Sequence, residues 1–464
     1  MVTIRQFFLI MLQRFFISIS PKAIACVLRV FIRMRLSNGK DTLWYRNRCN
    51  KLTILALDSE RYRGDLSVLA HSGQLRVLHI RQGWQNILIQ GFFSEKYYVH
   101  DIVNARLGSR LYEEHLAAQA HVAKVLEWLY KLVTVDAVTT VHFKYLSDYY
   151  WTDASEKSNI PYILLHRECN LMSPIIFDIV KNMMEKQGYF HGSHVVVHNQ
   201  KAKEVFIQSK FFDARKITVA SALRMDDLIK SINKYSSVDY KYKIKKRRKR
   251  FILFYFPFNS VSFGTTRTDI DLGGYGLDEG IWDKSKELFT ELHHTILRLA
   301  ESNTDVDFVI KPKKVFMKGG EWDFFKEVVS SSGIEVEALD NYVVDADLDV
   351  HELIKNSDII CGLQSSTTIE SAILGKRVVF PFFNNYMKTA YFRQFPWREY
   401  LQLFDVALSC KEFEVIFSDA LENPSVSDSI MKQRKELYLE CFDDLSGSAE
   451  RNYIKAIIKT INRK

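Results

Sequence analysis

Short apolar runs alternate with amphipathic stretches along most of the chain. In the first half, the apolar runs are KLTILALD, QLRVLHI, VDAVTTV, PYILLH and HVVVHNQ. Helical patterns separate them, and the longest of these spans residues 110–132. Near-continuous runs rich in β-branched residues are typical of parallel strands that helices cover on both faces. We therefore predict a doubly wound α/β domain in this half.

The same alternation begins again near residue 250. Its apolar runs are FILFYFP, VDFVIKPK, IEVEAL, SDIICG and RVVFPFF, with helical patterns between them. The chain has 464 residues, which is too long for one hydrophobic core and suits two domains of about 200 residues each. The predicted fold class is α/β, with two doubly wound, Rossmann-like domains that face each other across a cleft.

A basic run separates the two predicted domains. Eight of the ten residues in KYKIKKRRKR, at positions 241–250, are Lys or Arg, and such blocks are often solvated linkers. We expect an N-terminal domain over residues 46–235, a linker over 236–250, and a C-terminal domain with closing helices over 251–464. No aromatic platform, helix-turn-helix pattern or zinc-finger spacing accompanies the run, so nucleic acid is not a predicted partner.

The first 45 residues carry seven Lys or Arg and no acid before Asp41. Basic residues interrupt their apolar stretches, so no run reaches the roughly 20 residues of a membrane span. No small-residue cleavage site of a secretory signal follows either. We predict basic amphipathic helices here, which either lie on an anionic membrane surface or pack on the neighbouring domain.

The six cysteines are scattered without the CxxC spacing of a zinc site. They also do not form the pattern of a disulfide scaffold, and this favours a reducing compartment. We therefore expect a cytoplasmic protein that is peripheral to the inner face of the cytoplasmic membrane.

Candidate site residues follow directly after the predicted strands. In open parallel sheets, ligands bind beyond the carboxyl ends of the strands. The residues at these ends are His166, Arg167, Glu168, Asn199, Arg224, Asp226, Lys311, Lys313, Lys314, Gln364, Ser365, Ser366, Thr367 and Thr368.

The run SSTT at positions 365–368 stands between a predicted strand and a helix. Hydroxyls and unpaired backbone N–H groups at a helix start, together with the helix dipole, favour an anion. One hydroxyl is enough for a helix cap, so capping is the alternative explanation. Four hydroxyls in succession, followed by Glu370 in what we expect to be the first turn, favour a phosphate site.

The stretch from KPK to SDIICGLQSSTTIESAILGKRVVFP resembles the C-terminal domain of GT-B glycosyltransferases, particularly bacterial enzymes of capsule and surface-carbohydrate biosynthesis. It is also similar to the HP and SS motifs of sialyl-, polysialyl- and Kdo-transferases, with Lys311 where that family has His. SALRMDDLI is similar to a segment that ends the N-terminal domain in related enzymes. The resemblance covers most of residues 50–460.

The resemblance implies that the C-terminal domain binds the nucleotide of a nucleotide-sugar donor and that the N-terminal domain faces the acceptor. Its donor-binding residues would be Lys311, Lys313, Gln364, Ser365, Ser366, Thr367, Thr368 and Glu370. The replacement of His by Lys311 leaves the base of the donor open, with a CMP-linked sugar as one option. No DxD motif stands in a suitable position, so we expect no metal and no cofactor besides the substrate.

The acceptor hydroxyl needs a general base. Glu168 is the first candidate and His166 the second; the alternative is a surface loop in which Arg167 and Glu168 pair. The DEG at positions 278–280 is similar to a base motif of the sialyltransferases, but it stands after the linker. Arg167, Asn199, Arg224 and Asp226 are candidates for the acceptor side of the cleft.

The leading functional hypothesis is transfer of a sugar to a surface polysaccharide or lipopolysaccharide, with a glycan or glycolipid acceptor at an anionic membrane. A CDP-glycerol-type polyol-phosphate transferase is a second enzymatic hypothesis, and a sugar-nucleotide 2-epimerase is a third. A non-catalytic protein that binds nucleotides or carbohydrates with the same fold is the remaining alternative.

Overall fold

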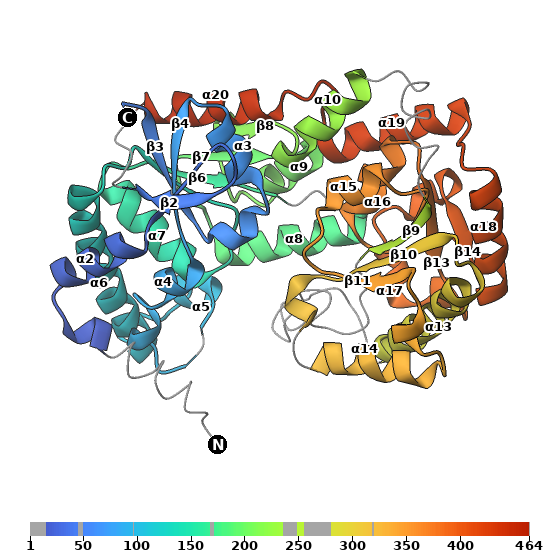
Figure 1. The fold of residues 1–464 in the computed structure, drawn as a ribbon. Helices are drawn as coiled ribbons and strands as arrows, with labels where there is room; N and C mark the ends of the chain where they lie inside the picture. Colours follow the sequence, from blue (N-terminus) through green and yellow to red (C-terminus); the bar gives the residue numbers. More distant parts are fainter. Residues whose placement is uncertain are drawn as a thin grey trace. The chain divides into compact units, whose positions relative to one another are not determined.

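The computed structural model describes residues 15–44, 50–95, 97–167, 171–234, 248–254, 280–317 and 320–463. Contacts divide the chain into two compact units, drawn in Figure 1. Unit 1 comprises Met1–Glu168, Lys181–Lys230 and Phe442–Lys464, and unit 2 comprises Cys169–Val180 and Ser231–Cys441. The sequence placed the last helix in the C-terminal domain, whereas these contacts assign it to unit 1.

Unit 1 contains an eight-stranded sheet in the order β2-β1-β4-β3-β5-β6-β7-β8. Strands β3 to β8 are parallel, and a short antiparallel hairpin of β1 and β2 extends the sheet beside β4. The strands are β1 (Arg33–Arg35), β2 (Asp41–Leu43), β3 (Leu52–Leu57), β4 (Leu75–Ile80), β5 (Ala137–Thr140), β6 (Tyr162–Leu165), β7 (His194–Val197) and β8 (Ile217–Val219).

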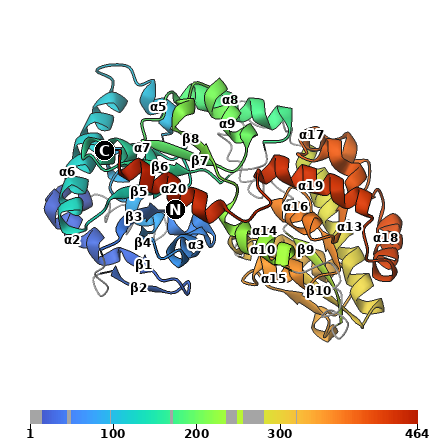
Figure 2. The same ribbon diagram turned by 90° about the horizontal axis from the view of Figure 1, so that it is seen from above.

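Helices cover both faces of this sheet, as the sequence predicted. Its helices are α2 (Pro21–Phe31), α3 (Asp65–His71), α4 (Gln82–Asn86), α5 (Val99–Val103), α6 (Arg110–Leu132), α7 (Leu146–Lys157), α9 (Gln200–Gln208) and α20 (Ala449–Ile461). Helices α8 (Pro174–Gln187) and α10 (Asp226–Lys234) are divided between the units. In Figure 2, α20 lies in front of the unit 1 strands, where Ile457 packs with Ile54 of β3 and Leu69 of α3 in one core.

In the N-terminal segment, α2 is one of the predicted helices, and residues 1–14, where the other was expected, lie outside the described residues. Helix α2 is followed by the β1–β2 hairpin, which Gly39 turns with a φ of +78°. The apolar face of α2 is used within unit 1, since Ile24 and Leu28 are completely buried and α2 packs against α6. The Lys22 ammonium lies 5.0 Å from the ring of Trp128 on α6. Packing on the domain thus accounts for this helix.

Unit 2 contains a six-stranded parallel sheet in the order β11-β10-β9-β12-β13-β14. The strands are β9 (Lys249–Phe254), β10 (Val306–Lys311), β11 (Tyr342–Val344), β12 (Ile359–Cys361), β13 (Arg377–Pro381) and β14 (Asp405–Ala407). In chain order this is the 3-2-1-4-5-6 arrangement of a Rossmann fold. The IEVEAL segment, which we predicted as a strand, instead holds a 3-10 turn at Val336–Ala338, and β11 begins later at Tyr342.

The helices of unit 2 are α13 (Gly280–Ser302), α14 (Gly320–Ser331), α15 (Val350–Lys355), α16 (Ser366–Ile373), α17 (Ala390–Arg393), α18 (Cys410–Glu422) and α19 (Asp428–Phe442), the last of which ends at the boundary with unit 1. Aromatic side chains fill the layer between sheet and helix, where Phe308 of β10 stacks on Phe417 of α18 at 5.6 Å. Both units are therefore doubly wound α/β folds. Within the described ranges, no helix has the length and apolarity to span a membrane.

Candidate functional site

The strand order of unit 2 reverses between β9 and β12. From β9 the chain passes to β10 and β11 on one side, and it then returns to β12 on the other. Ligands of open parallel sheets bind beyond the carboxyl ends of the strands at such a point. Helix α16 begins there at Ser366, five residues after β12 ends at Cys361. The hydroxyl run therefore stands at the position where this fold class binds ligands.

The four hydroxyls of the run have different roles. Ser365 is the N-cap residue of α16, and its Oγ accepts a hydrogen bond from the Thr367 backbone N–H at 3.4 Å. Its Oγ also lies 2.7 Å from Oγ1 of Thr367. Thr368 is buried and donates from Oγ1 to the Ser365 carbonyl at 2.7 Å. Capping accounts for Ser365, and the hydrogen bond to the Ser365 carbonyl accounts for Thr368. Gln364, Ser366 and Thr367 are half-buried at the helix start.

A glycine sets the distance between β12 and α16. A Cβ added to Gly362 would lie 3.0 Å from Cγ2 of Thr368 and 3.8 Å from Cβ of Phe254 at the end of β9. The first of these distances is shorter than ordinary packing allows. The absence of a side chain at residue 362 therefore lets the start of α16 lie close against the ends of two adjacent strands.

Lys311 ends β10 at the same edge of the sheet, in register with Phe254 of β9. Because only β9 lies between β10 and β12, their ends are about 10 Å apart. Lys311 donates from Nζ to the Ala346 carbonyl at 2.6 Å, and burial lowers its pKa, a shift that Asp345 and Asp347 oppose. Lys313 is exposed, and the exposed Lys314 pairs with Asp347 at 2.7 Å.

Glu370 differs from the sequence expectation in its place on the helix. It lies beyond the first turn of α16, it is 1% exposed, and its Oε2 lies 3.2 Å from Nε2 of His351 on α15. A buried carboxylate beside an imidazole ties α15 to α16. The contact with His351 explains why a carboxylate is buried at residue 370 without any role in donor binding.

In unit 1, His166 and Arg167 follow β6. His166 is buried, and its ring centroid lies 5.2 Å from that of Phe206. Arg167 forms a buried ion pair, with 2.7 Å between its Nε and Oδ2 of Asp65 at the start of α3. Its guanidinium also donates to the Arg61 carbonyl. Arg167 is thus committed to the inside of unit 1, and Glu168 lies outside the described residues, as do Asp278 and Glu279.

The remaining acceptor-side candidates stabilise helices or lie against aromatic rings within unit 1. Asn199 is completely buried and caps α9 by accepting from the Ala202 N–H at 2.8 Å. Asp226 accepts from the N–H groups of Ala449 at 2.9 Å and Glu450 at 2.7 Å, at the start of α20. The Arg224 guanidinium lies 6.0 Å from the ring of Phe442. These contacts are structural explanations for the three residues.

A polar cluster that the sequence did not indicate lies where the strand order of unit 1 reverses, between β3 and β5. Asp58 follows β3 directly, is 5% exposed and has a φ of +54°, which is uncommon for a residue with a side chain. Its Oδ2 lies 2.7 Å from Nε of Arg61. Burial raises the pKa of Asp58 to about 6, although Arg61 opposes the shift.

Residues that follow β5 complete this cluster. The Arg61 guanidinium lies 3.3 Å from Nε2 of His142 and also contacts the Tyr145 hydroxyl. Asp148 on α7 is buried, accepts from Oγ1 of Thr140 at 3.0 Å, and has a pKa that burial raises to about 8. The sequence did hold a signal for Asp58, because the residue stands immediately after the apolar run LTILAL.

No family model matches the chain, and no curated protein matches it in sequence. One solved structure with a similar chain path is a Listeria monocytogenes protein described as a putative UDP-N-acetylglucosamine 2-epimerase. It has 14% sequence identity and a TM-score of 0.49, and the match covers 89% of this chain and 98% of that one. MnaA of S. aureus with UDP has 13% identity and a TM-score of 0.47, covering 89% and 97%. A variant of the wall teichoic acid polymerase TagF has 13% identity and a TM-score of 0.45, covering 92% of each chain.

Proposed function

We propose that the chain is a glycosyltransferase of the GT-B type, which moves a sugar from a nucleotide-sugar donor to a glycan or glycolipid acceptor without a metal ion. The observation that carries the proposal is the start of α16 at the strand-order reversal of unit 2. Backbone N–H groups, the helix dipole and the half-buried Ser366 and Thr367 favour a phosphate there. A nucleotide sugar presents such a phosphate.

The same groups suit the chemistry of the leaving nucleotide. When the glycosyl–phosphate bond breaks, negative charge develops on the phosphate oxygen. Helix-start N–H groups at α16 and the lysines after β10 are positive groups at one edge of one sheet. We propose that they stabilise this charge, with Lys313, which is exposed, as the most adaptable of the cations.

For the general base, we propose a carboxylate of unit 1. Glu168 is the candidate from the sequence, and Asp58 is the candidate among the described residues. A pKa of about 6 leaves Asp58 ionised at neutral pH but basic enough to accept a proton from an acceptor hydroxyl. His166 is the weaker candidate, because it is 3% exposed and packed among aromatic rings.

The experiment that tests this function is incubation of the full chain with single nucleotide sugars, CDP-glycerol and glycan acceptors. Products are identified by mass spectrometry and released nucleotides by chromatography. A glycosylated acceptor with the nucleotide released supports the proposal. Release of CMP from CDP-glycerol identifies the polyol-phosphate transferase, and an altered sugar on an intact nucleotide identifies the epimerase. Donor binding without any turnover identifies the binding protein.

We also propose that the acceptor is linked to lipid and that the protein acts at the inner face of the cytoplasmic membrane, in the biosynthesis of a surface polysaccharide or lipopolysaccharide. The basic N-terminal sequence and the 56% exposed side chain of Phe15 support this. The packing of α2 on α6 limits the contribution of α2, because its apolar face is already buried. The segment before residue 15, with Phe7 and Phe8, lies outside the described residues.

A further inference from the structure

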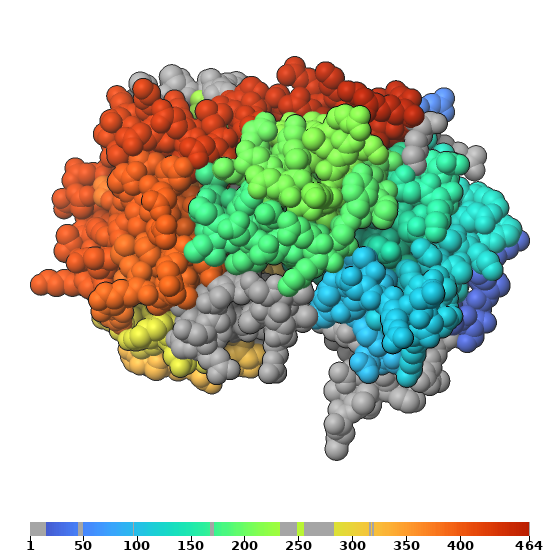
Figure 3. Space-filling view, turned by 180° about the vertical axis from the view of Figure 1, so that it is seen from behind, coloured from blue at the N-terminus to red at the C-terminus, as the bar shows by residue number. Residues whose placement is uncertain are grey.

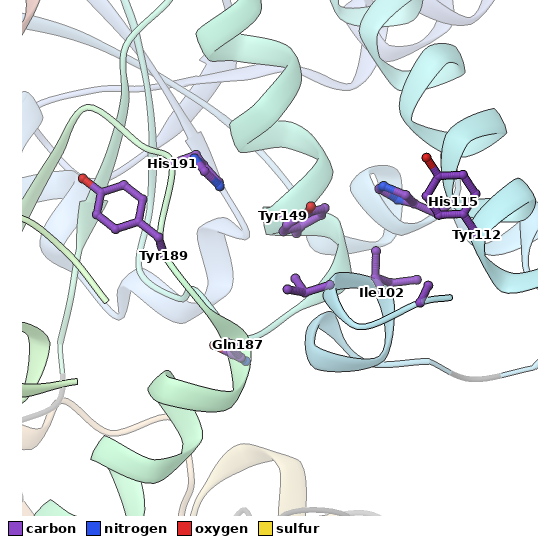
Figure 4. A pocket seen from close by; sticks show the side chains of 9 residues that line it. Ile102, Tyr112, His115, Tyr149, Gln187, Tyr189 and His191 are labelled. Atoms are coloured by element: carbon purple, nitrogen blue, oxygen red, sulfur yellow. The ribbon is translucent and has the colours of Figure 1, made fainter. Parts of the chain in front are cut away.

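A small cavity lies within unit 1, where α5, the first turns of α6 and α7, and the segment after α8 meet. Its volume is about 220 Å³. The side chains that line it include Ile102, Tyr112, His115, Tyr149, Gln187 and His191. In Figure 4, Tyr149 lies between His191 on one side and His115 with Tyr112 on the other. On the face seen in Figure 3, the light-blue segment near residue 100 adjoins the green segment near residue 190.

Gln187 lines this cavity and has a polar atom without a hydrogen-bond partner among the described residues. It is the last residue of α8, it is 8% exposed, and its Oε1 has no hydrogen-bond partner among the described residues. A buried amide oxygen without a donor is uncommon in proteins, and it costs stability relative to a paired one. A ligand that brings a hydroxyl or another O–H or N–H donor into the cavity would satisfy Oε1.

The cavity is also lined by aromatic side chains, among them Tyr112, His115 and Tyr149. The ring of His115 lies 6.1 Å from that of Tyr149 and 6.5 Å from that of Tyr112, by centroid. Nδ1 of His115 lies 2.8 Å from the Tyr150 hydroxyl, and burial lowers the pKa of His115, so the imidazole is neutral at neutral pH. Such side chains combine apolar faces with polar atoms at their edges. They suit a ligand with an apolar ring face and hydroxyls around it.

The charge and size of the cavity narrow the ligand class. None of the described residues that line it is Lys, Arg, Asp or Glu, so nothing in it balances a phosphate or carboxylate. A volume of about 220 Å³ is below the roughly 300 to 1,000 Å³ of sites for larger ligands, which favours a single ring. We propose that this cavity binds one neutral sugar residue of the acceptor glycan, an inference that rests on the proposed transferase function.

The test is direct binding of neutral saccharides to the full chain in the absence of any nucleotide. Glucose, galactose, mannose and N-acetylglucosamine are titrated at millimolar concentration, with uridine and cytidine as counter-ligands, and binding is followed by saturation-transfer NMR. The variant is Gln187→Leu, with Gln187→Met as a second variant of closer length. The matched control is Gln208→Leu, because Gln208 is also the last residue of a helix in unit 1 but is exposed.

We expect at least one saccharide to bind the wild-type chain and to bind Gln187→Leu at least tenfold more weakly, with Gln208→Leu unchanged. The melting temperature of Gln187→Leu should not fall, since the unpaired amide oxygen is removed. The proposal is overturned if no saccharide of the panel binds, if Gln187→Leu and Gln187→Met bind as the wild type does, or if the nucleosides displace the sugar.

The outcome separates this site from the proposed function. Saccharide binding that depends on Gln187, in a chain that turns over no donor, supports the cavity and rejects the transferase. Sugar transfer that Gln187→Leu and Gln187→Met leave unchanged, together with unchanged saccharide binding, rejects the cavity and keeps the transferase.

Discussion

The two units have the same kind of parallel sheet but different chemistry where the strand order reverses. In unit 2, a helix begins at this point, with half-buried hydroxyls and with lysines after a nearby strand. In unit 1, the corresponding position holds Asp58, which is buried and paired with Arg61. The first arrangement suits an anion, and the second suits the movement of a proton.

In the proposed transferase, the two units would hold groups that need different electrostatic environments. A phosphate needs positive groups, whereas a general base needs a carboxylate whose pKa is not lowered by many cations. If both sets of groups stood at one sheet edge, the lysines would lower the pKa of the carboxylate and make it a poor base. Division between two sheets lets each edge keep its own electrostatic environment.

The largest effect is expected from removal of the base in unit 1. If Asp58 accepts the acceptor proton, Asp58→Asn should lower the turnover number by about 10² to 10⁴-fold, with donor binding preserved. In the wild type, turnover should fall as pH drops through about 6, because protonated Asp58 cannot accept a proton. Steady-state kinetics across pH, with donor binding measured by calorimetry, gives both results.

Glu168→Gln is the parallel variant, and Glu204→Gln on α9 of the same unit is the control. A loss confined to Glu168→Gln would make Glu168 the base and leave Asp58 with a structural role. If all three variants keep full turnover, the base does not come from either candidate, and the comparison between the two sheet edges fails for unit 1.

The second effect concerns Asp148, the other buried carboxyl at the unit 1 edge. Its pKa is raised from 3.8 to about 8, so between these values the folded chain binds a proton that the unfolded chain has released. The free energy of unfolding therefore falls as pH rises through this window, by about 1.4 kcal/mol per pH unit for this group. Asp148→Asn has no such proton, and its stability should depend less steeply on pH.

Urea unfolding of the wild type and of Asp148→Asn at several pH values between 5 and 9 measures this difference, where roughly half-unit steps suffice. Equal slopes for the two proteins would mean that Asp148 is ionised in the folded state. The buried part of unit 1 would then carry a second negative charge close to Asp58.

The third effect is at the unit 2 edge. Replacement of Ser365 and Ser366 by Ala should weaken nucleotide binding at least tenfold, about 1.4 kcal/mol, because the helix start loses two hydroxyls. Ser409→Ala is the matched control, since Ser409 caps α18 after β14 in the same sheet, away from the reversal. Both variants lose a cap, but only the double variant should lose affinity in calorimetric titration with cytidine and uridine nucleotides.

Much of this fold could be predicted because its strands are apolar runs, and α6 has the predicted bounds of residues 110 and 132. The prediction of a strand at IEVEAL was wrong, because its alternating apolar and acidic residues have the pattern of a strand. The segment that pairs with β10 is instead Tyr342–Val344. The β1–β2 hairpin was missed although Asn38 and Gly39 form a known turn signal.

The site was less predictable than the fold. The strand-end rule selected the hydroxyl run as a candidate, and the structure has a helix start there, at Ser366. The strand-end rule could not show that Asp226 caps α20, because Asp226 and Ala449 at the start of this helix are 223 positions apart. Nor could it show that Arg167 pairs with Asp65, since partners that are distant in sequence decide whether a strand-end side chain is available to a ligand.

The smallest effect is expected from the basic N-terminal sequence of the chain. In our proposal, unit 2 binds the anionic donor, and the basic N-terminal sequence of unit 1 binds an anionic membrane. Two of the cations in this sequence already have partners within unit 1, since Arg35 pairs with Asp41 at 2.7 Å and Lys22 lies over Trp128.

Deletion of residues 1–14 removes Arg5 and Arg14 with Phe7 and Phe8 but keeps α2, whose loss would expose the packing surface of α6. We expect this deletion to weaken sedimentation with anionic liposomes by about fivefold at low salt, near 1 kcal/mol, and to have little effect with neutral lipid. Equal sedimentation of the two proteins with anionic lipid at low salt would show that the first 14 residues are not a membrane anchor.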